Sequence, residues 1–265
     1  MSILLMTATI NSGNFGNVRT QIKDTEERKR QYEEALYKYI VLSNFDKIVF
    51  AENSGESFDI QRFEKLAEEH GKMFEFLYLP GDKETMQIYG KSYGEAQLIS
   101  DALCNSKLFD NEQVFYKVTG RIWISNINEL IDNEVNSCFV AHNFVSWLLT
   151  SFFKVRIDDF LENLLNAKKF CNDFDDNDNC IEHVYFELMK KAKHKVKCFK
   201  KYPEFTGVVS GTGTAYKKSS GGIKLRNVLI RLKWYDMEIK TRWYYSLLLK
   251  TAIFVNKILC KIRTK

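Results

Sequence analysis

Short apolar runs alternate with amphipathic stretches along the first half of the chain. The runs at 3–10, 47–51 and 74–79 have the length and composition of buried strands. Between them, 24–43 and 59–70 place their apolar residues on one face of a helix. This alternation predicts βαβ units and an α/β fold with a mostly parallel sheet flanked by helices.

A further strand is predicted in the stretch 114–126, where apolar and polar residues alternate before Thr119-Gly120-Arg121. Glycine allows a ligand to approach the backbone, and arginine presents several donors to a phosphate. In parallel sheets, ligands bind at the carboxyl ends of the strands, where the segments Thr7–Thr9 and Glu52–Ser54 also lie. The alternative is a buried strand followed by a turn and a surface arginine.

The segment Gly90-Lys91-Ser92-Tyr93-Gly94-Glu95 leads into a helix through 103. Exposed backbone amides, a lysine and a helix N-terminus together favour an anion-binding site. The order of residues is not that of a P-loop, and a plain turn before a helix is the alternative.

The second half is predicted to contain a strand at 137–141 and helices at 159–167 and 181–189. The acidic cluster 173–178 has ligands for Mg²⁺ or Mn²⁺, but it lacks the pattern of an EF-hand, and a solvated helix cap is favoured. A strand from 203 runs into a glycine-rich loop at 210–214, which suits a phosphate or a sugar and equally suits a flexible connection.

The C-terminal region differs from the rest of the chain. Aromatic and basic residues alternate there, and much of the net charge of +5 lies in the final third. Such an amphipathic helix suits an anionic membrane surface, and packing on the domain or on a second subunit is the alternative. We expect a catalytic domain at 1–222 and a membrane-associating helical extension at 223–265.

The chain has six cysteines but no Cys-x-x-Cys pair, and no histidine lies at metal-ligand spacing to them. This argues against a zinc site. The apolar run after Met1 is too short for a signal peptide, so a cytoplasmic protein with reduced cysteines is expected.

Several of these segments together resemble bacterial glycosyltransferases of surface-polysaccharide assembly, of O-antigen or capsule. The matching pieces span about 3–216, and the most specific are Lys117-Val-Thr-Gly-Arg121 and Gly90-Lys-Ser-Tyr-Gly-Glu95. The others are Asp24-x-x-x-Arg28-x-x-x-Tyr32, Glu52-Asn-Ser-Gly55 and Ser210-Gly-Thr-x-x-x-Tyr216. The resemblance implies a GT-A-type nucleotide-sugar fold.

In GT-A enzymes the strand that corresponds to 114–119 ends in Asp-x-Asp, which holds a metal ion on the donor diphosphate. This chain has Thr119-Gly120-Arg121 there. A divalent metal is therefore possible but not expected, and no other cofactor is expected. Arg121, with Lys117 or Lys91, would then neutralise the diphosphate.

An inverting transfer needs a carboxylate as base, and Glu182 is the preferred candidate over Asp158, Asp159 and Glu95. The expected donor-binding residues are Thr7, Thr9, Asn53, Lys91, Glu95, Lys117, Thr119, Gly120 and Arg121. A loop with Ser210, Gly211 and Thr212 would contact the acceptor or a phosphate.

The expected partners are a nucleotide-sugar donor, a lipid-linked saccharide acceptor and the inner-leaflet membrane surface, reached through the C-terminal helix. One alternative is a nucleic-acid-binding protein that uses the basic C-terminal third, although the chain has no recognisable nucleic-acid-binding motif. A non-catalytic, membrane-associated assembly partner with the same fold is another.

Overall fold

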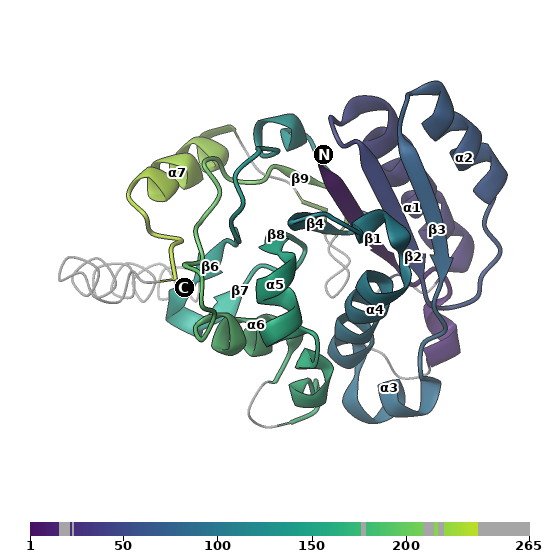
Figure 1. The fold of residues 1–265 in the computed structure, drawn as a ribbon. Coiled ribbons are helices and arrows are strands. Elements are labelled where there is room, and N and C mark those ends of the chain that lie inside the picture. The colour runs from purple at the N-terminus through teal and green to yellow at the C-terminus, as the bar shows by residue number, and fades with distance from the viewer. Residues whose placement is uncertain (16–21, 23, 176–178, 209–214, 217–219, 238–265) are drawn as a thin grey trace, which may run out of the picture.

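A five-stranded sheet forms the centre of the computed structural model, which describes residues 1–15, 22, 24–175, 179–208, 215–216 and 220–237 (Figure 1). The strand order is β3-β2-β1-β4-β8, in which the first four strands are parallel and β8 is antiparallel to β4. The strands are β1 (Ile3–Ala8), β2 (Lys47–Glu52), β3 (Met73–Tyr78), β4 (Val114–Thr119) and β8 (Phe152–Arg156). The α/β fold and mostly parallel sheet predicted from the sequence are therefore confirmed.

Helices cover both faces of this sheet. Helices α1 (Thr25–Leu42) and α2 (Ile60–Glu69) pack on the face that receives Leu4 and Met6 of β1. Helices α4 (Lys91–Asn105) and α6 (Ile181–Met189) pack on the opposite face. Both faces of β1 and β2 are thus buried, which explains why these two strands read as continuous apolar runs, whereas the edge strand β3 is only partly buried.

Helices α1 and α2 begin where an aspartate supplies a cap. The Asp24 side chain accepts the Glu27 amide of α1 at 2.7 Å, and the Asp59 side chain accepts the Arg62 amide of α2 at 3.2 Å. Each bond satisfies an amide that has no partner within its own helix.

Shorter elements connect and extend the layers. They are η1 (Ser12–Phe15), α3 (Lys83–Tyr89), η2 (Lys107–Phe109), β5 (Trp123–Ile124), η3 (Ile127–Glu129), β6 (Ala141–His142), η4 (Asn143–Val145), β7 (Trp147–Leu148), α5 (Ile157–Asp159), η5 (Phe160–Leu164), η6 (Ala167–Phe170), β9 (Phe205–Thr206) and α7 (Ser220–Arg231).

Two predicted strands are much shorter than expected. In 137–141, Cys138 makes only isolated bridges and Ala141 begins the short β6–β7 pair. In the segment from 203, β9 has two residues, which pair with β5. Apolar composition predicted burial correctly in both places, but burial alone does not make a strand without a partner of matching length.

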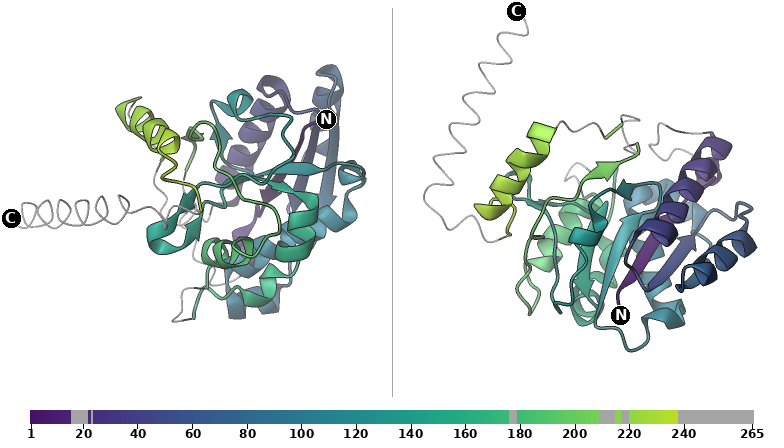
Figure 2. Two further views of the ribbon diagram at one scale, coloured as in Figure 1. Left: turned by 60° about the vertical axis from the view of Figure 1, so that its left-hand side comes forward. Right: turned by 90° about the horizontal axis from the view of Figure 1, so that it is seen from above.

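The domain boundary expected after residue 222 stays a prediction, although part of the chain beyond it packs on the core. Helix α7 spans that position, and Ile230 and Tyr235 are buried in the core shared with α1. Figure 2 shows α7 at the end of the molecule away from α2. The remainder of the predicted extension, 238–265, lies outside the described residues. Among the helices that the structure describes, none has the length and apolar character needed to cross a bilayer.

Candidate functional site

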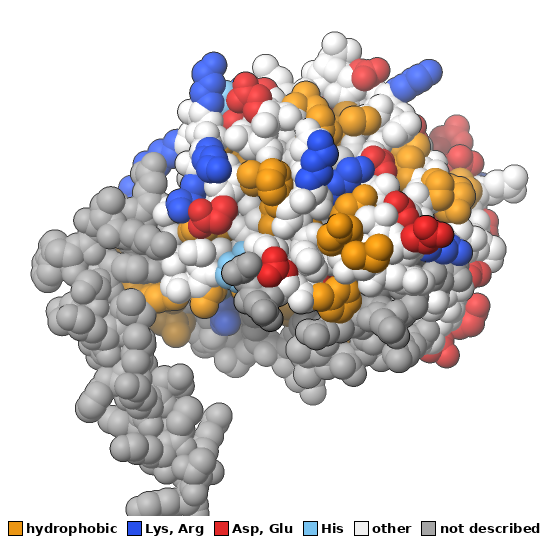
Figure 3. Space-filling view, turned by 90° about the horizontal axis from the view of Figure 1, so that it is seen from below, with side chains coloured by type: hydrophobic (Ala, Val, Ile, Leu, Met, Phe, Trp, Pro, Cys, Tyr) orange, Lys and Arg blue, Asp and Glu red, His pale blue; other side chains and the backbone are white. Residues whose placement is uncertain are grey.

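The carboxyl ends of β1 and β4 lie side by side and bring polar residues together. Thr7 pairs with Thr119 in the register of the two strands. The Gly120 amide donates to the Thr7 carbonyl at 2.9 Å, and a Cβ on Gly120 would lie 2.8 Å from the same oxygen. This close approach therefore requires glycine. Figure 3 views the molecule from this edge, where charged side chains of both signs lie among hydrophobic ones.

Lys117 is a fully buried cation next to this edge. Its Nζ contacts the Glu95 carboxylate and donates to the Thr119 hydroxyl at 3.2 Å and to the Thr150 carbonyl at 2.9 Å. Glu95, which comes from α4, keeps 28% of its side chain exposed. Three oxygens thus compensate the buried ammonium, which in turn fixes Glu95 at the edge of the sheet.

Glu182, in the first turn of α6, belongs to the same cluster. Its carboxylate accepts the Thr150 hydroxyl at 3.1 Å. Burial raises the pKa of Glu182 above the ordinary value of 4.5, the charge of Glu95 raises it further, and Lys91 opposes the shift. A carboxylate with a raised pKa is a stronger base than an exposed one. The structure therefore brings Glu95, Lys117 and Glu182 together, while their roles in donor binding and as the base stay predictions.

Thr9 and Asn53 form a second group, nearer β2. The Thr9 hydroxyl donates to Asn53 Oδ1 at 2.8 Å, and Thr7 and Asn53 are only 5% and 4% exposed. The adjacent Glu52 is fully buried, and its carboxylate accepts three backbone amides from the loops that follow β1 and β2. These side chains hold the two loops together and use their hydrogen-bonding groups within the protein.

Arg121 lies on the α1 side of the sheet. It is 4% exposed, its Nη1 donates to Gln31 Oε1 at 2.9 Å, and its guanidinium lies over the Tyr32 ring, 5.9 Å from the ring centre. Lys117 belongs instead to the cluster with Glu95 on the other face. Lys117 is paired with Glu95 and does not lie with Arg121, and its part in neutralising a diphosphate stays a prediction.

Tyr216 links the two sides of the site. Burial raises the pKa of its hydroxyl, which is hydrogen-bonded to Ser151. The charge of Arg121 lowers this pKa, and the charge of Glu182 raises it. The hydroxyl is therefore within electrostatic reach of both side chains.

The N-terminus of α4, expected to bind an anion, holds a carboxylate of the protein itself. Gly90, with a φ of 91°, precedes Lys91 at the start of the helix. Asp173 accepts the Ser92 amide at 3.0 Å and contacts the Ser92 hydroxyl, while its own amide donates to the Tyr89 carbonyl at 2.8 Å. A phosphate would have to displace Asp173, so this helix start is not an open anion site. Lys91 itself is exposed and remains accessible.

Replacing Asp173 by Ala is expected to lower the free energy of unfolding by about 1 kcal/mol, because α4 loses its cap. The melting temperature should fall by about 2–4 °C in a thermal unfolding experiment. Asp173→Asn, which keeps an acceptor oxygen, should lower the melting temperature less. An unchanged melting temperature in Asp173→Ala would show that this contact does not cap the helix.

Asp158 and Asp159, the weaker candidates for the base, lie at the opposite edge of the sheet. Strand β8 is antiparallel, so Arg156 at its end pairs with Val114 at the start of β4. Asp158 binds Arg156, and the buried Asp159 accepts from the Ser137 hydroxyl at 2.6 Å. The structure therefore does not bring either candidate to the edge that carries Glu182, because β8 is antiparallel, a direction that the sequence pattern did not reveal.

An alternative role for these two carboxylates, instead of acting as a base, is to bind a metal cation. His194 Nδ1 lies 2.8 Å from Asp159 Oδ1, and one atom from each of Asp158, Asp159 and His194 falls within 4.8 Å of the others. Arg156 already supplies the positive charge there. An internal ion-pair network explains this cluster without a metal.

Some site residues escaped the sequence analysis, and some predicted ones fall outside the described residues. Ser210, Gly211 and Thr212 are among the latter. Thr150 and Gln31 carry no local signal, because their partners lie 32 or more residues away in the chain. Asp173 belongs to the acidic cluster 173–178, for which a helix cap is favoured, but the sequence does not show that the helix it caps is the distant α4. Tyr216 was marked only as the last residue of the Ser210–Tyr216 motif.

No protein family matches the sequence, and no curated protein matches it. Solved structures do resemble the fold. A nucleoside-diphosphate-sugar pyrophosphorylase from Vibrio cholerae has 11% identity and a TM-score of 0.42, with 71% of this chain and 88% of that chain covered. A Desulfovibrio desulfuricans protein provisionally named a nucleotide-diphospho-sugar transferase has 12% identity and a TM-score of 0.42, with 88% and 98% covered. HddC from Yersinia pseudotuberculosis has 11% identity and a TM-score of 0.34, with 78% and 93% covered. At such identities the likeness concerns the fold alone.

Proposed function

We propose that this protein is a GT-A-like glycosyltransferase that transfers a sugar from a nucleotide-sugar donor to a lipid-linked saccharide in bacterial surface-polysaccharide synthesis. The reaction is inverting and needs no metal ion. The observation that supports it is the position of Glu182: a carboxylate with a raised pKa lies beside the Glu95–Lys117 pair, at the sheet edge where α/β proteins bind their ligands.

In the proposed reaction, Glu182 takes the proton of an acceptor hydroxyl while that oxygen attacks the anomeric carbon of the donor sugar. A new carbon–oxygen bond forms, and the bond to the diphosphate oxygen breaks. The nucleoside diphosphate leaves with the electron pair, and its charge is stabilised by Arg121. Arg121 stands where metal-dependent relatives carry acidic residues, which is why the proposal includes no metal ion.

The donor is the first component to test. Nucleotide sugars with UDP, GDP, CMP and dTDP should be compared in a thermal shift assay, in which binding at 100 times Kd stabilises the native state by about 2.7 kcal/mol. One nucleotide class is expected to raise the melting temperature by several degrees. No response to any donor would contradict the proposal.

Helix α7 supports the membrane part of the proposal. Its exposed face carries Leu225 and Val228, and Leu232 follows directly, whereas Ile230 faces the core. Exposed basic residues such as Lys224 flank the apolar positions, and the sequence has no acidic residue between 217 and 235. An apolar row among basic side chains matches an anionic lipid surface. The protein would then be cytoplasmic and peripheral on the inner membrane.

Changing Leu225, Val228 and Leu232 together to Ser is expected to lower binding to anionic vesicles at least about tenfold, since each side chain loses its contact with lipid. Flotation with phosphatidylglycerol vesicles measures this. The matched control changes three exposed apolar residues elsewhere, Met73, Tyr78 and Ile88, to Ser. Equal flotation of both triple variants would remove α7 from the membrane contact.

A further inference from the structure

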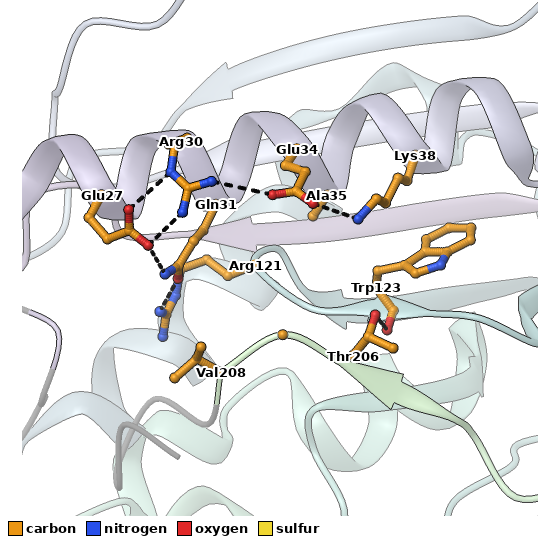
Figure 4. Close-up of a pocket in the computed structure, with 11 residues that line it drawn as sticks. Glu27, Arg30, Gln31, Glu34, Ala35, Lys38, Arg121, Trp123, Thr206 and Val208 are labelled. Carbon is orange, nitrogen blue, oxygen red and sulfur yellow. Dashed lines mark hydrogen bonds and ion pairs between the residues drawn. The ribbon is translucent and has the colours of Figure 1, made fainter. Parts of the chain in front are cut away.

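A groove of about 350 Å³ runs between α1 and the β5–β9 pair. Figure 4 shows side chains from one face of α1 along one wall and Thr206 and Val208 on the other. Arg121 lines it near Gln31, and Trp123 lines it further along α1, toward Lys38. The groove thus has a cationic position and an aromatic position.

The Arg121 position has a hydrogen-bond donor without a partner. Gln31 accepts a hydrogen bond from Nη1, but Nε is buried and no residue that the structure describes accepts a hydrogen bond from it. Among the described residues, no carboxylate pairs with Arg121. The two carboxylates of α1 that line the groove are engaged with that helix's own cations, since Glu27 binds Arg30 at 2.8 Å and Glu34 binds Lys38 at 2.6 Å. A buried guanidinium in this state favours an anionic group on the ligand.

The Trp123 position suits a flat ring. The indole is half-buried and rests against Tyr39, with ring centres 4.9 Å apart and planes inclined at 65°. Tyr39 is itself fully buried, and its hydroxyl donates to the Ile122 carbonyl at 3.1 Å, so the support is rigid. An indole held in this way is a stacking surface for a nucleobase.

We infer that the nucleoside diphosphate of the donor occupies this groove, with its base against Trp123 and its phosphates at Arg121. The inference rests on the proposed function and moves the nucleoside away from Thr7, Thr9 and Asn53, whose polar groups bond within the protein. Polar side chains of α1 then face the ribose. The sugar extends from Arg121 past Tyr216 toward Glu182.

Calorimetric titration of the full chain with UDP, GDP, CDP, dTDP and pyrophosphate tests this arrangement. Trp123→Ala is expected to weaken binding of the preferred nucleoside diphosphate at least tenfold while pyrophosphate binding stays within twofold. Arg121→Ala is expected to weaken both at least tenfold. The matched control is Tyr37→Ala, which removes an exposed ring of α1 that does not line the groove.

Trp123→Phe keeps a supporting ring in case the alanine variant does not fold. The nucleoside diphosphate should quench tryptophan fluorescence in the unmodified protein, and Trp123→Phe should lose most of that quenching while its affinity stays within about threefold. Undiminished quenching in Trp123→Phe, or wild-type affinity in Trp123→Ala, would overturn the inference and leave the transferase proposal intact. Failure of every nucleotide and nucleotide sugar to bind the unmodified protein would overturn both.

Discussion

Glu182→Gln is expected to lower kcat for sugar transfer about 10²- to 10⁴-fold, because a carboxamide cannot take the proton of the acceptor hydroxyl. Donor affinity should change little, since Glu182 acts on the acceptor side of the reaction. The measurement is the initial rate with the donor identified by thermal shift, together with a titration of that donor. Glu187→Gln, on an exposed position of the same helix, is the matched control.

The pH dependence gives an independent check of Glu182. Because its pKa is raised by burial and by Glu95, the ionised base forms only as the pH rises through that raised value, and kcat should rise in the same range. The folded state also binds this proton more tightly than the unfolded state. The stability that Glu182 contributes is therefore fully present below pH 4.5, and it is lost as the pH rises through the raised pKa.

Glu182→Gln should remove that part of the pH dependence of unfolding. An active Glu182→Gln enzyme, with the pH profile of the unmodified protein, would assign the base to another residue.

Lys117→Met is expected to lower the free energy of unfolding by about 3 kcal/mol, because it leaves the Glu95 carboxylate and the Thr150 carbonyl without their cation. This loss of stability is at the lower end of the range for a broken buried ion pair, because Glu95 is partly exposed and regains some hydration. Equilibrium denaturation with urea measures the change. Lys190→Met, which breaks an exposed ion pair with Glu187, should lower the free energy of unfolding by at most about 1 kcal/mol.

The double variant Glu95→Gln/Lys117→Met tests whether the loss comes from the pair. It should recover part of the stability lost in Lys117→Met, because no unpaired charge then remains. A double variant as unstable as the sum of the two single variants would show that Lys117 and Glu95 act independently.

Much of the fold was predictable because it depends on local patterns. The apolar runs and the helical periodicity each involve residues a few positions apart, and these predicted β1–β4, α1 and α2. The order of strand and helix also placed Thr7 and Thr119 at one edge, because βαβ units make parallel strands, whose carboxyl ends lie at the same edge of the sheet. The convergence of the candidate site followed from that rule.

Only the tertiary structure decided which of those residues contact one another. Local sequence cannot show that β8 runs antiparallel, which takes Asp158 and Asp159 to the far edge. Nor does it show that Asp173 caps a helix that begins 82 residues earlier, or that Lys117 is neutralised by Glu95. Periodicity specifies which face of a segment is buried. The partner of a buried charge depends instead on how distant segments pack, and in this protein that packing separates Arg121 from Lys117.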